Sequence, residues 1–391
     1  MATIGSNRRF SIESKNPSFP SVAFLWPALA AEQAREFAAA IAKEFAKLAG
    51  GSEPQQPGVE PEWTTRNEVT LELESVRLRD FSTSPDGVAT LVCAPFALHG
   101  ATIADFAPRH SLVAALQGAG VQRILVTDWR SATATMRFLS IDNYLADLNV
   151  LVDQIGAKVD LVGLCQGGWL ALVFAARFPA KVRKLVLAGA PIDIEAGDCA
   201  LTRLARGTPT SLFREFVEVG EGRVLGRHSL EFWGPRAEER EAIHRVLQVP
   251  DHVASALLRQ LEARFLDWYA WTVDLPGVYF LQVVEQVYKE NRLATGRFVA
   301  LGQCVDLTKV SCPIYLLAAH DDDLVAPGQV FATARLVGTA SQDIQQAIAP
   351  CPHLGLFMGR ATLTQVWPDI THWLVQPTTK VRSSTKWPAG P

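Results

Sequence analysis

The sequence lacks long hydrophobic runs, and none of its apolar stretches approaches the roughly 18 consecutive residues that a transmembrane helix requires. We therefore expect no membrane-spanning segment. An excess of positive charge is also missing, since 37 lysines and arginines stand against 40 aspartates and glutamates in 391 residues. A net charge of −3 with no basic stripe argues against nucleic acid as a partner.

Paired cysteines are missing too. The six cysteines are scattered and form no C-x-x-C motif, which argues against a zinc site or a disulfide framework. Their positions are Cys93, Cys165, Cys199, Cys304, Cys312 and Cys351. Such cysteine usage is typical of a reducing compartment, so we expect a cytoplasmic protein with neither a metal nor a cofactor.

Composition and periodicity predict five parts along the chain. Residues 30–49 place apolar side chains at helical spacing, and residues 51–61 have the composition of a linker. The predicted parts are a polar tail with an amphipathic helix and linker (1–66), a first core part (67–194), a helical, aromatic-rich cap (195–295), a second core part (296–376) and a C-terminal tail (377–391). We expect the aromatic stretch 213–288 to shield the site, and truncation of Trp268 or Trp271 to open it.

The two core parts alternate strand and helix patterns. A run at 69–73 alternates apolar and polar residues, as in a half-exposed antiparallel strand, and helical patterns occupy 141–155 and 169–178. Nearly continuous apolar runs, typical of strands buried on both faces, lie at 90–94, 124–127, 159–163, 185–188 and 314–318. This order predicts an α/β fold: a mainly parallel sheet flanked by helices, with the cap over the carboxyl ends of its strands, where such sheets bind ligands.

One cysteine stands in a motif that carries chemistry. The strand pattern 159–163 runs into Gly-Leu-Cys165-Gln-Gly-Gly, and a helix-forming run follows. This is the nucleophile elbow of the α/β-hydrolase fold, with cysteine in the serine position. The start of the helix favours a thiolate and directs the main-chain N–H of Gln166 at an oxyanion. A second oxyanion donor is expected from the loop after 90–94, at Phe96 or Ala97.

A thiolate nucleophile works with a histidine base and a carboxylate that orients the histidine. In this fold the chain order is nucleophile, acid, histidine. Three consecutive aspartates, residues 321–323, follow the strand pattern 314–318 and are all candidates for the acid. His353 is the next suitable histidine. His372 lies in the terminal helix pattern 363–374 and is expected at the surface.

These residues resemble two related families, the poly(3-hydroxyalkanoate) synthases and the intracellular polyhydroxyalkanoate depolymerases. The resemblance covers residues 89–374. The Cys165 motif is similar to the synthase box G-x-C-x-G-G, and the stretch 103–113 also resembles the synthases. Asp274-Leu-Pro and the stretch from His353 to Arg360 are closer to the depolymerases. The synthase acid motif D-H-[I/L]-V corresponds to Asp322-Asp-Leu-Val, so the resemblance implies Asp322 as the acid, although the residue after it departs from the pattern.

The resemblance implies a Cys165–His353–Asp322 triad acting on 3-hydroxyacyl substrates, with two directions of reaction left open. A synthase would transfer the acyl group from 3-hydroxyacyl-coenzyme A to a growing polyester. A depolymerase would transfer it from the polymer to water or a thiol. The synthase direction is favoured because the nucleophile motif matches better. A third hypothesis, a non-catalytic granule-associated protein, is disfavoured by the complete triad. Granule association, a homodimer and a partner subunit remain open.

Overall fold

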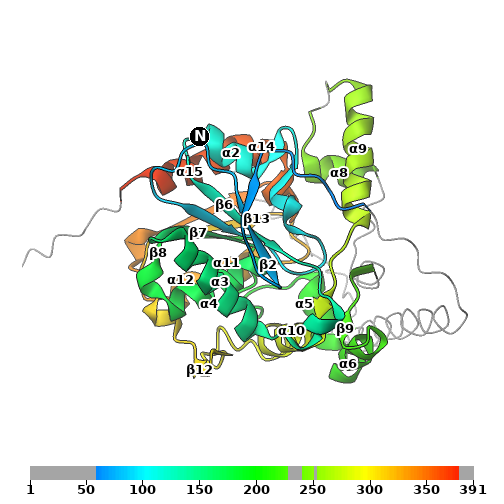
Figure 1. The fold of residues 1–391 in the computed structure, drawn as a ribbon, viewed down its shortest axis with the longest axis vertical. Helices are drawn as coiled ribbons and strands as arrows, with labels where there is room; N and C mark the ends of the chain where they lie inside the picture. The colour runs from blue at the N-terminus through cyan, green and yellow to red at the C-terminus, as the bar shows by residue number, and fades with distance from the viewer. Residues whose placement is uncertain (1–58, 228–239, 251–252, 378–391) are drawn as a thin grey trace, which may run out of the picture.

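The short apolar runs of the sequence form the centre of an eight-stranded sheet in the computed structural model, which describes residues 59–227, 240–250 and 253–377 (Figure 1). The prediction of a mainly parallel α/β sheet is confirmed. In sheet order the strands are β1 (Glu68–Glu72), β2 (Val76–Asp80), β6 (Ile124–Trp129), β3 (Thr90–Cys93), β7 (Val159–Leu164), β8 (Val182–Ala188), β13 (Ile314–Ala319) and β14 (Ile344–Ala349).

Most of the sheet is parallel, and the sequence pattern predicted the strands that are buried on both faces. Strands β6, β3, β7, β8, β13 and β14 pair in parallel, and β2 runs antiparallel to both β1 and β6. The sequence pattern missed β2 and β14. In β2 arginines alternate with apolar residues, and β14 is an edge strand whose Gln345 and Gln346 are exposed. Neither strand therefore has the continuous apolar run of a strand buried on both faces.

Helices cover both faces of this sheet. Because successive side chains of a strand point to opposite faces, Leu91 and Cys93 of β3 pack in one apolar cluster and Val92 and Ala94 in another. The first cluster includes α3 (Ile141–Ile155), α4 (Gln166–Arg177), α11 (Pro327–Phe331) and α12 (Thr333–Leu336). The second includes α2 (Leu112–Gly118), α13 (Gly355–Met358), α14 (Arg360–Gln365) and α15 (Trp367–Val375).

The short elements lie in the connections. The two-residue or three-residue strands β4 (Asp105–Ala107), β5 (His110–Ser111), β11 (Val299–Ala300) and β12 (Gln303–Cys304) form two small ribbons. The 3-10 turns are η2 (Ala101–Ala104), η3 (Ala134–Phe138), η4 (Pro179–Lys181), η6 (Leu307–Lys309) and η7 (Ser341–Asp343). Within the described residues, no helix combines the length and the apolar character that a membrane span requires.

The predicted cap is mainly helical where the structure describes it. Its helices are α5 (Ala200–Gly207), α6 (Thr210–Val219), α8 (Arg240–Leu247), α9 (Ser255–Ala270), α10 (Gly277–Val283) and the π-helix η5 (Val284–Lys289). The short strands β9 (Arg223–Val224) and β10 (Leu275–Pro276) pair within it, where the sequence showed no strand pattern. The predicted N-terminal helix (30–49), most of the linker and residues 378–391 of the predicted tail lie outside the described residues.

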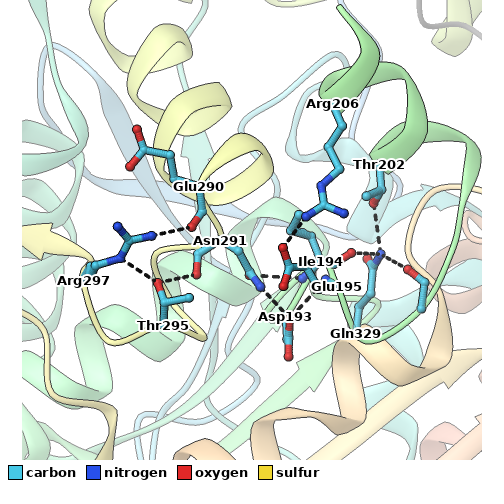
Figure 2. A network of polar contacts seen from close by, with 11 residues as sticks. Asp193, Ile194, Glu195, Thr202, Arg206, Glu290, Asn291, Thr295, Arg297 and Gln329 are labelled. Carbon is cyan, nitrogen blue, oxygen red and sulfur yellow. Dashed lines mark hydrogen bonds and ion pairs between the residues drawn. The ribbon is translucent and has the colours of Figure 1, made fainter. Parts of the chain in front are cut away.

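A buried polar network joins the two ends of the cap to the core (Figure 2). Asp193, at the entry to the cap, accepts a hydrogen bond from Nδ2 of Asn291 near its exit, at 2.7 Å. Gln329 of α11 donates through Nε2 to the carbonyl of Ile194 at 3.3 Å and to Oγ1 of Thr202 at 3.0 Å. These bonds join segments that are far apart in the sequence, so the network connects entry, exit and core.

Candidate active site

The predicted nucleophile stands at the turn between β7 and α4. Cys165 has φ 49° and ψ −118°, a conformation that residues with a side chain rarely adopt. The glycines around it permit a close approach of helix and strands. A Cβ on Gly167 would lie 2.2 Å from the carbonyl oxygen of Cys93, and one on Gly168 would lie 2.4 Å from Cβ of Ala190. Each glycine therefore occupies a place that no larger residue fits.

The structure brings His353 and Asp322 into direct contact. Nδ1 of His353 lies 2.7 Å from Oδ2 of Asp322, and both side chains are buried. Oδ1 of Asp322 accepts hydrogen bonds from the main-chain N–H groups of Leu324 and Val325, at 2.9 and 2.8 Å. These bonds hold the carboxylate in place. Since an ionised carboxylate can only accept, Nδ1 of His353 carries the proton and Nε2 is left for the nucleophile.

The charges of the site act together on His353. Burial alone would lower the pKa of its imidazole, but the negative charges of Asp322 and Cys165, with the hydrogen bonding to them, raise that pKa well above its ordinary value. Nε2 of His353 is buried and has no regular hydrogen-bond partner among the described residues. Cys165 is therefore near enough to raise the pKa of the imidazole, and Nε2 is the ring nitrogen that can transfer a proton in the reaction.

The two neighbouring aspartates occupy different environments. Asp321 and His320 are exposed side chains that contact each other at 2.6 Å. Asp323 is exposed, and its carbonyl accepts from the main-chain N–H of Ala200 at 3.0 Å. Of the three consecutive aspartates, only Asp322 contacts His353. His372, in α15, is exposed as expected.

The two predicted oxyanion donors lie on either side of the elbow. Gln166 is the first residue of α4 and Phe96 lies in the loop after β3, and both line one pocket with Cys165. Neither main-chain N–H has a hydrogen-bond acceptor among the described residues, so both remain able to donate. Ala97 lines the same pocket.

Sequence reasoning placed two tyrosines, Tyr279 and Tyr288, in the aromatic stretch 213–288 but did not show that they contact this loop and helix. The side chain of Gln166 accepts from Nε1 of Trp169 at 2.7 Å and donates to the hydroxyl of Tyr288. The hydroxyl of Tyr279 lies 3.5 Å from the carbonyl oxygen of Phe96. Both tyrosines belong to the cap, more than a hundred residues away from the elbow, and no local pattern marks them.

A pocket of about 490 Å³ opens above Cys165. The loops that follow β3, β7, β13 and β14 supply one wall and the cap supplies the other, which places the pocket at the carboxyl ends of the strands. Its apolar and aromatic lining includes Leu98, Ile103, Tyr269, Tyr279, Phe280 and Tyr288. Such a pocket, with a few polar groups beside a reactive one, suits a small molecule with an apolar part.

The predicted shielding residues need a correction. Trp268 and Trp271 do not line the pocket. Trp268 is buried in the second apolar cluster, where it packs edge-on against Phe106, and it lies behind the lining residue His99. The aromatic cap residues that line the pocket are instead the tyrosines and phenylalanine of α9, α10 and η5. Helical spacing alone did not show which ring on each helix faces the site. Two further predicted shield residues, Phe232 and Trp233, lie outside the described residues.

Comparisons with known proteins show which families the chain resembles. A family model described as "PHB de-polymerase C-terminus" matches residues 250–377. The chain is 30% identical to a poly(3-hydroxyalkanoate) polymerase subunit PhaC from Synechocystis sp., over 69% of this chain and 73% of that protein. It is 28% identical to the subunit of that name from Allochromatium vinosum, over 65% and 71% of the two chains.

The comparison with solved structures concerns the fold. A bromoperoxidase from Bacillus anthracis superposes with a TM-score of 0.51 and 17% identity, covering 80% of this chain and all of that one. Together with the order of the strands, this likeness confirms the predicted α/β-hydrolase fold.

Proposed function

Because the chain belongs to the family of poly(3-hydroxyalkanoate) polymerase subunits, we propose that it is an acyltransferase that builds polyester from 3-hydroxyacyl-coenzyme A through a thioester on Cys165. The observation that carries this proposal is the Cys165–His353–Asp322 arrangement beneath an apolar pocket. The same reaction would place the protein at polymer granules in the cytoplasm.

The first half-reaction acylates the enzyme. The thiolate of Cys165 attacks the carbonyl carbon of the substrate thioester, and the oxyanion that forms accepts hydrogen bonds from the N–H groups of Gln166 and Phe96. The carbon–sulfur bond to coenzyme A then breaks. The leaving thiolate takes the proton from Nε2 of His353, so free coenzyme A departs and Cys165 holds the acyl group. Asp322 stabilises the imidazolium before the transfer.

The second half-reaction lengthens the polymer. The hydroxyl at the end of the growing chain gives its proton to Nε2 of His353 while its oxygen attacks the acyl carbonyl on Cys165. The bond to sulfur breaks, the thiolate is regenerated and one ester bond has formed. Water competes with this hydroxyl, so synthesis needs an acceptor held in place and water kept out. Positioning of a reactant can be worth effective molarities of about 10⁵ M or more, which is enough for the positioned hydroxyl to react faster than water.

The direct test supplies 3-hydroxybutyryl-coenzyme A and follows free thiol and products together. The proposal predicts release of coenzyme A with the acyl groups recovered as oligomer, and loss of both signals in Cys165→Ala. A wild-type protein that releases only free 3-hydroxybutyrate would overturn the synthase direction. A protein that releases no coenzyme A and retains no acyl group on Cys165 would favour the non-catalytic, granule-associated alternative.

A second candidate function is depolymerisation, and the family model over residues 250–377 favours it specifically. The stretch from His353 to Arg360 lies within that match. In this direction the polymer ester acylates Cys165 and water or a thiol removes the acyl group, with His353 transferring the same protons. Incubation with amorphous poly(3-hydroxybutyrate) decides the matter: soluble acid released from polymer, with no oligomer formed from the thioester, would establish it.

A further inference from the structure

A second histidine lines the pocket and has no part in the reaction described above. His99 lies in the loop after β3, half-buried, and shares the pocket with Cys165 and His353. Its Nδ1 lies 3.3 Å from the carbonyl oxygen of Trp271. A carbonyl oxygen can only accept, so Nδ1 carries the proton and Nε2 of the neutral ring holds a bare lone pair.

The ring stays neutral because of its surroundings. Burial lowers the pKa of His99 to about 4, and the hydrogen bond to Trp271 offsets only part of that effect. Nε2 has no hydrogen-bond partner among the described residues, yet it is not among the fully buried atoms that lack one. Nε2 is therefore accessible to a molecule in the pocket as a hydrogen-bond acceptor.

Packing fixes the position of this acceptor. The imidazole lies against Trp268, with ring centres 4.4 Å apart, and against Tyr269 at 4.9 Å. The main-chain N–H of Val273 donates to the carbonyl of Leu98 at 3.0 Å, which holds the loop against the segment that contains Trp271. A Cβ on the next residue, Gly100, would lie 2.6 Å from Cζ3 of Trp271, so only glycine there lets the indole pack this closely.

Apart from the proposed triad, the other polar side chains of the lining form hydrogen bonds or are exposed. The side chain of Gln166 bonds to Trp169 and Tyr288, and the hydroxyl of Tyr279 contacts the carbonyl of Phe96. Asp321, Asp323 and Arg245 also line the pocket, but their side chains are exposed. His99 thus presents a rigid, neutral acceptor within an otherwise apolar wall.

We infer that His99 selects acyl groups that carry a hydroxyl at C3, by accepting a hydrogen bond from that hydroxyl through Nε2. The inference rests on the proposed acyl transfer and deepens it by naming a specificity-determining residue. An apolar wall discriminates weakly for or against one hydroxyl, whereas a placed acceptor is left unpaired by a substrate that lacks the group. The unhydroxylated acyl chain is therefore the disfavoured one.

The test compares acylation by 3-hydroxybutyryl-coenzyme A and by butyryl-coenzyme A, measured as kcat/KM for release of coenzyme A. The wild type should prefer the hydroxylated substrate by about tenfold or more, the range expected for an unpaired buried acceptor. His99→Phe keeps an aromatic ring between Trp268 and Tyr269 but removes the acceptor. It should slow the hydroxylated substrate alone and bring the ratio close to one. His99→Gln keeps an acceptor and should retain part of the preference.

The outcomes separate the inference from the proposed function. If His99→Phe slows both substrates equally, or if it leaves the wild-type ratio intact, His99 does not select the hydroxyl and the inference fails. If His99→Gln behaves as His99→Phe while both variants unfold at the wild-type temperature, an acceptor is not what matters, and the inference fails again. If the wild type releases coenzyme A from neither substrate, the proposed acyl transfer is wrong and the inference falls with it.

Discussion

Cys165 carries its thiol on a backbone conformation that suits glycine better than cysteine. Its positive φ costs about 1–3 kcal/mol, and the close contacts of Gly167 and Gly168 keep the turn from relaxing. The strain has a chemical result, because it places the sulfur above the sheet and beside the first N–H groups of α4. Reactivity at this residue and the stability of the turn are therefore opposed.

This opposition can be measured with two substitutions at one position. Cys165→Gly and Cys165→Ala both remove the sulfur and should both abolish acyl transfer. Only glycine relieves the strain, so we expect Cys165→Gly to be more stable to urea than Cys165→Ala by about 1 kcal/mol. Equal stability of the two variants would show that the turn is not strained.

The carboxylate of Asp322 governs the pH range of the site. It raises the pKa of His353, so the imidazolium persists to higher pH than an ordinary histidine would allow. Asp322→Asn removes this charge and lowers that pKa, and the alkaline limit of acylation should therefore shift to lower pH. The rate should also fall steeply, although by less than the factor of about 10⁴ known for a serine triad, since a thiolate needs less help.

Matched controls for this prediction lie next to the residue itself. Asp321→Asn and Asp323→Asn alter exposed carboxylates that do not contact His353. Both should keep the wild-type pH profile of coenzyme A release. A greater loss of rate in either control than in Asp322→Asn would show that Asp322 is not the acid.

Among the elements, the joint between cap and core is the polar network of Figure 2. Asn291 is buried, adopts φ 48°, donates to Asp193 and accepts from the main-chain N–H of Ile194 at 3.3 Å. Asparagine tolerates the left-handed conformation better than most residues and supplies both bonds. The side chain of Asn291 therefore joins the exit of the cap to its entry segment by hydrogen bonds.

Loss of that side chain should loosen the cap. Asn291→Ala removes one hydrogen bond to Asp193 and leaves the buried main-chain N–H of Ile194 without its acceptor, which costs about 1–3 kcal/mol in the free energy of unfolding. The looser cap should also admit water, so that the fraction of acyl groups recovered as free acid rises. Thr295→Ala is the control, since its hydroxyl bonds to the carbonyl of Asn291 and to Nε of Arg297 but not to the entry segment. If the control raises that fraction as much, the network does not set cap closure.

For the whole molecule, the proposed acyl transfer would give polyester or free acid according to how well the pocket between cap and sheet excludes water. Phe280 lines the pocket and packs against Phe213 and Phe216 of α6, whereas Trp268 is buried behind the lining. The two rings therefore have separable roles. We expect Phe280 to close the site and Trp268 to support the cap.

Truncation of each ring should give a different result. Phe280→Ala should open the pocket and increase hydrolysis of the acyl-enzyme, with thermal unfolding lowered only moderately. Trp268→Ala should cost about 3–5 kcal/mol of stability, as large-to-small changes in a core do. The measurements are the ratio of oligomer to free acid and a urea unfolding curve for each variant. An unchanged product ratio in Phe280→Ala would mean that this ring does not exclude water.

The sequence by itself was sufficient to predict the features that depend on residues close together in the chain. A strand buried on both faces needs a continuous apolar run, which is why β3, β6, β7, β8 and β13 could be predicted, and α3 shows the bounds expected from its periodicity. The elbow is local too, because the strand pattern, the glycines around Cys165 and the helix pattern follow one another directly in the sequence. Chain order then named the residues that the structure brings together, His353 and Asp322, although the resemblance was needed to choose among three aspartates.

Only the tertiary structure decided what depends on contacts between distant segments. Strand β2, which lies between β1 and β6, and the edge strand β14 are completed by their neighbours rather than by their own apolar residues. Of the two neighbouring rings of α9, Tyr269 lines the pocket and Trp268 does not, because Trp268 packs against Phe106. The proton of His99 lies on Nδ1 because Nδ1 faces the carbonyl oxygen of Trp271, which is 172 residues away in the chain. No pattern of neighbouring residues encodes such a contact, since it exists only once the cap has folded onto the sheet.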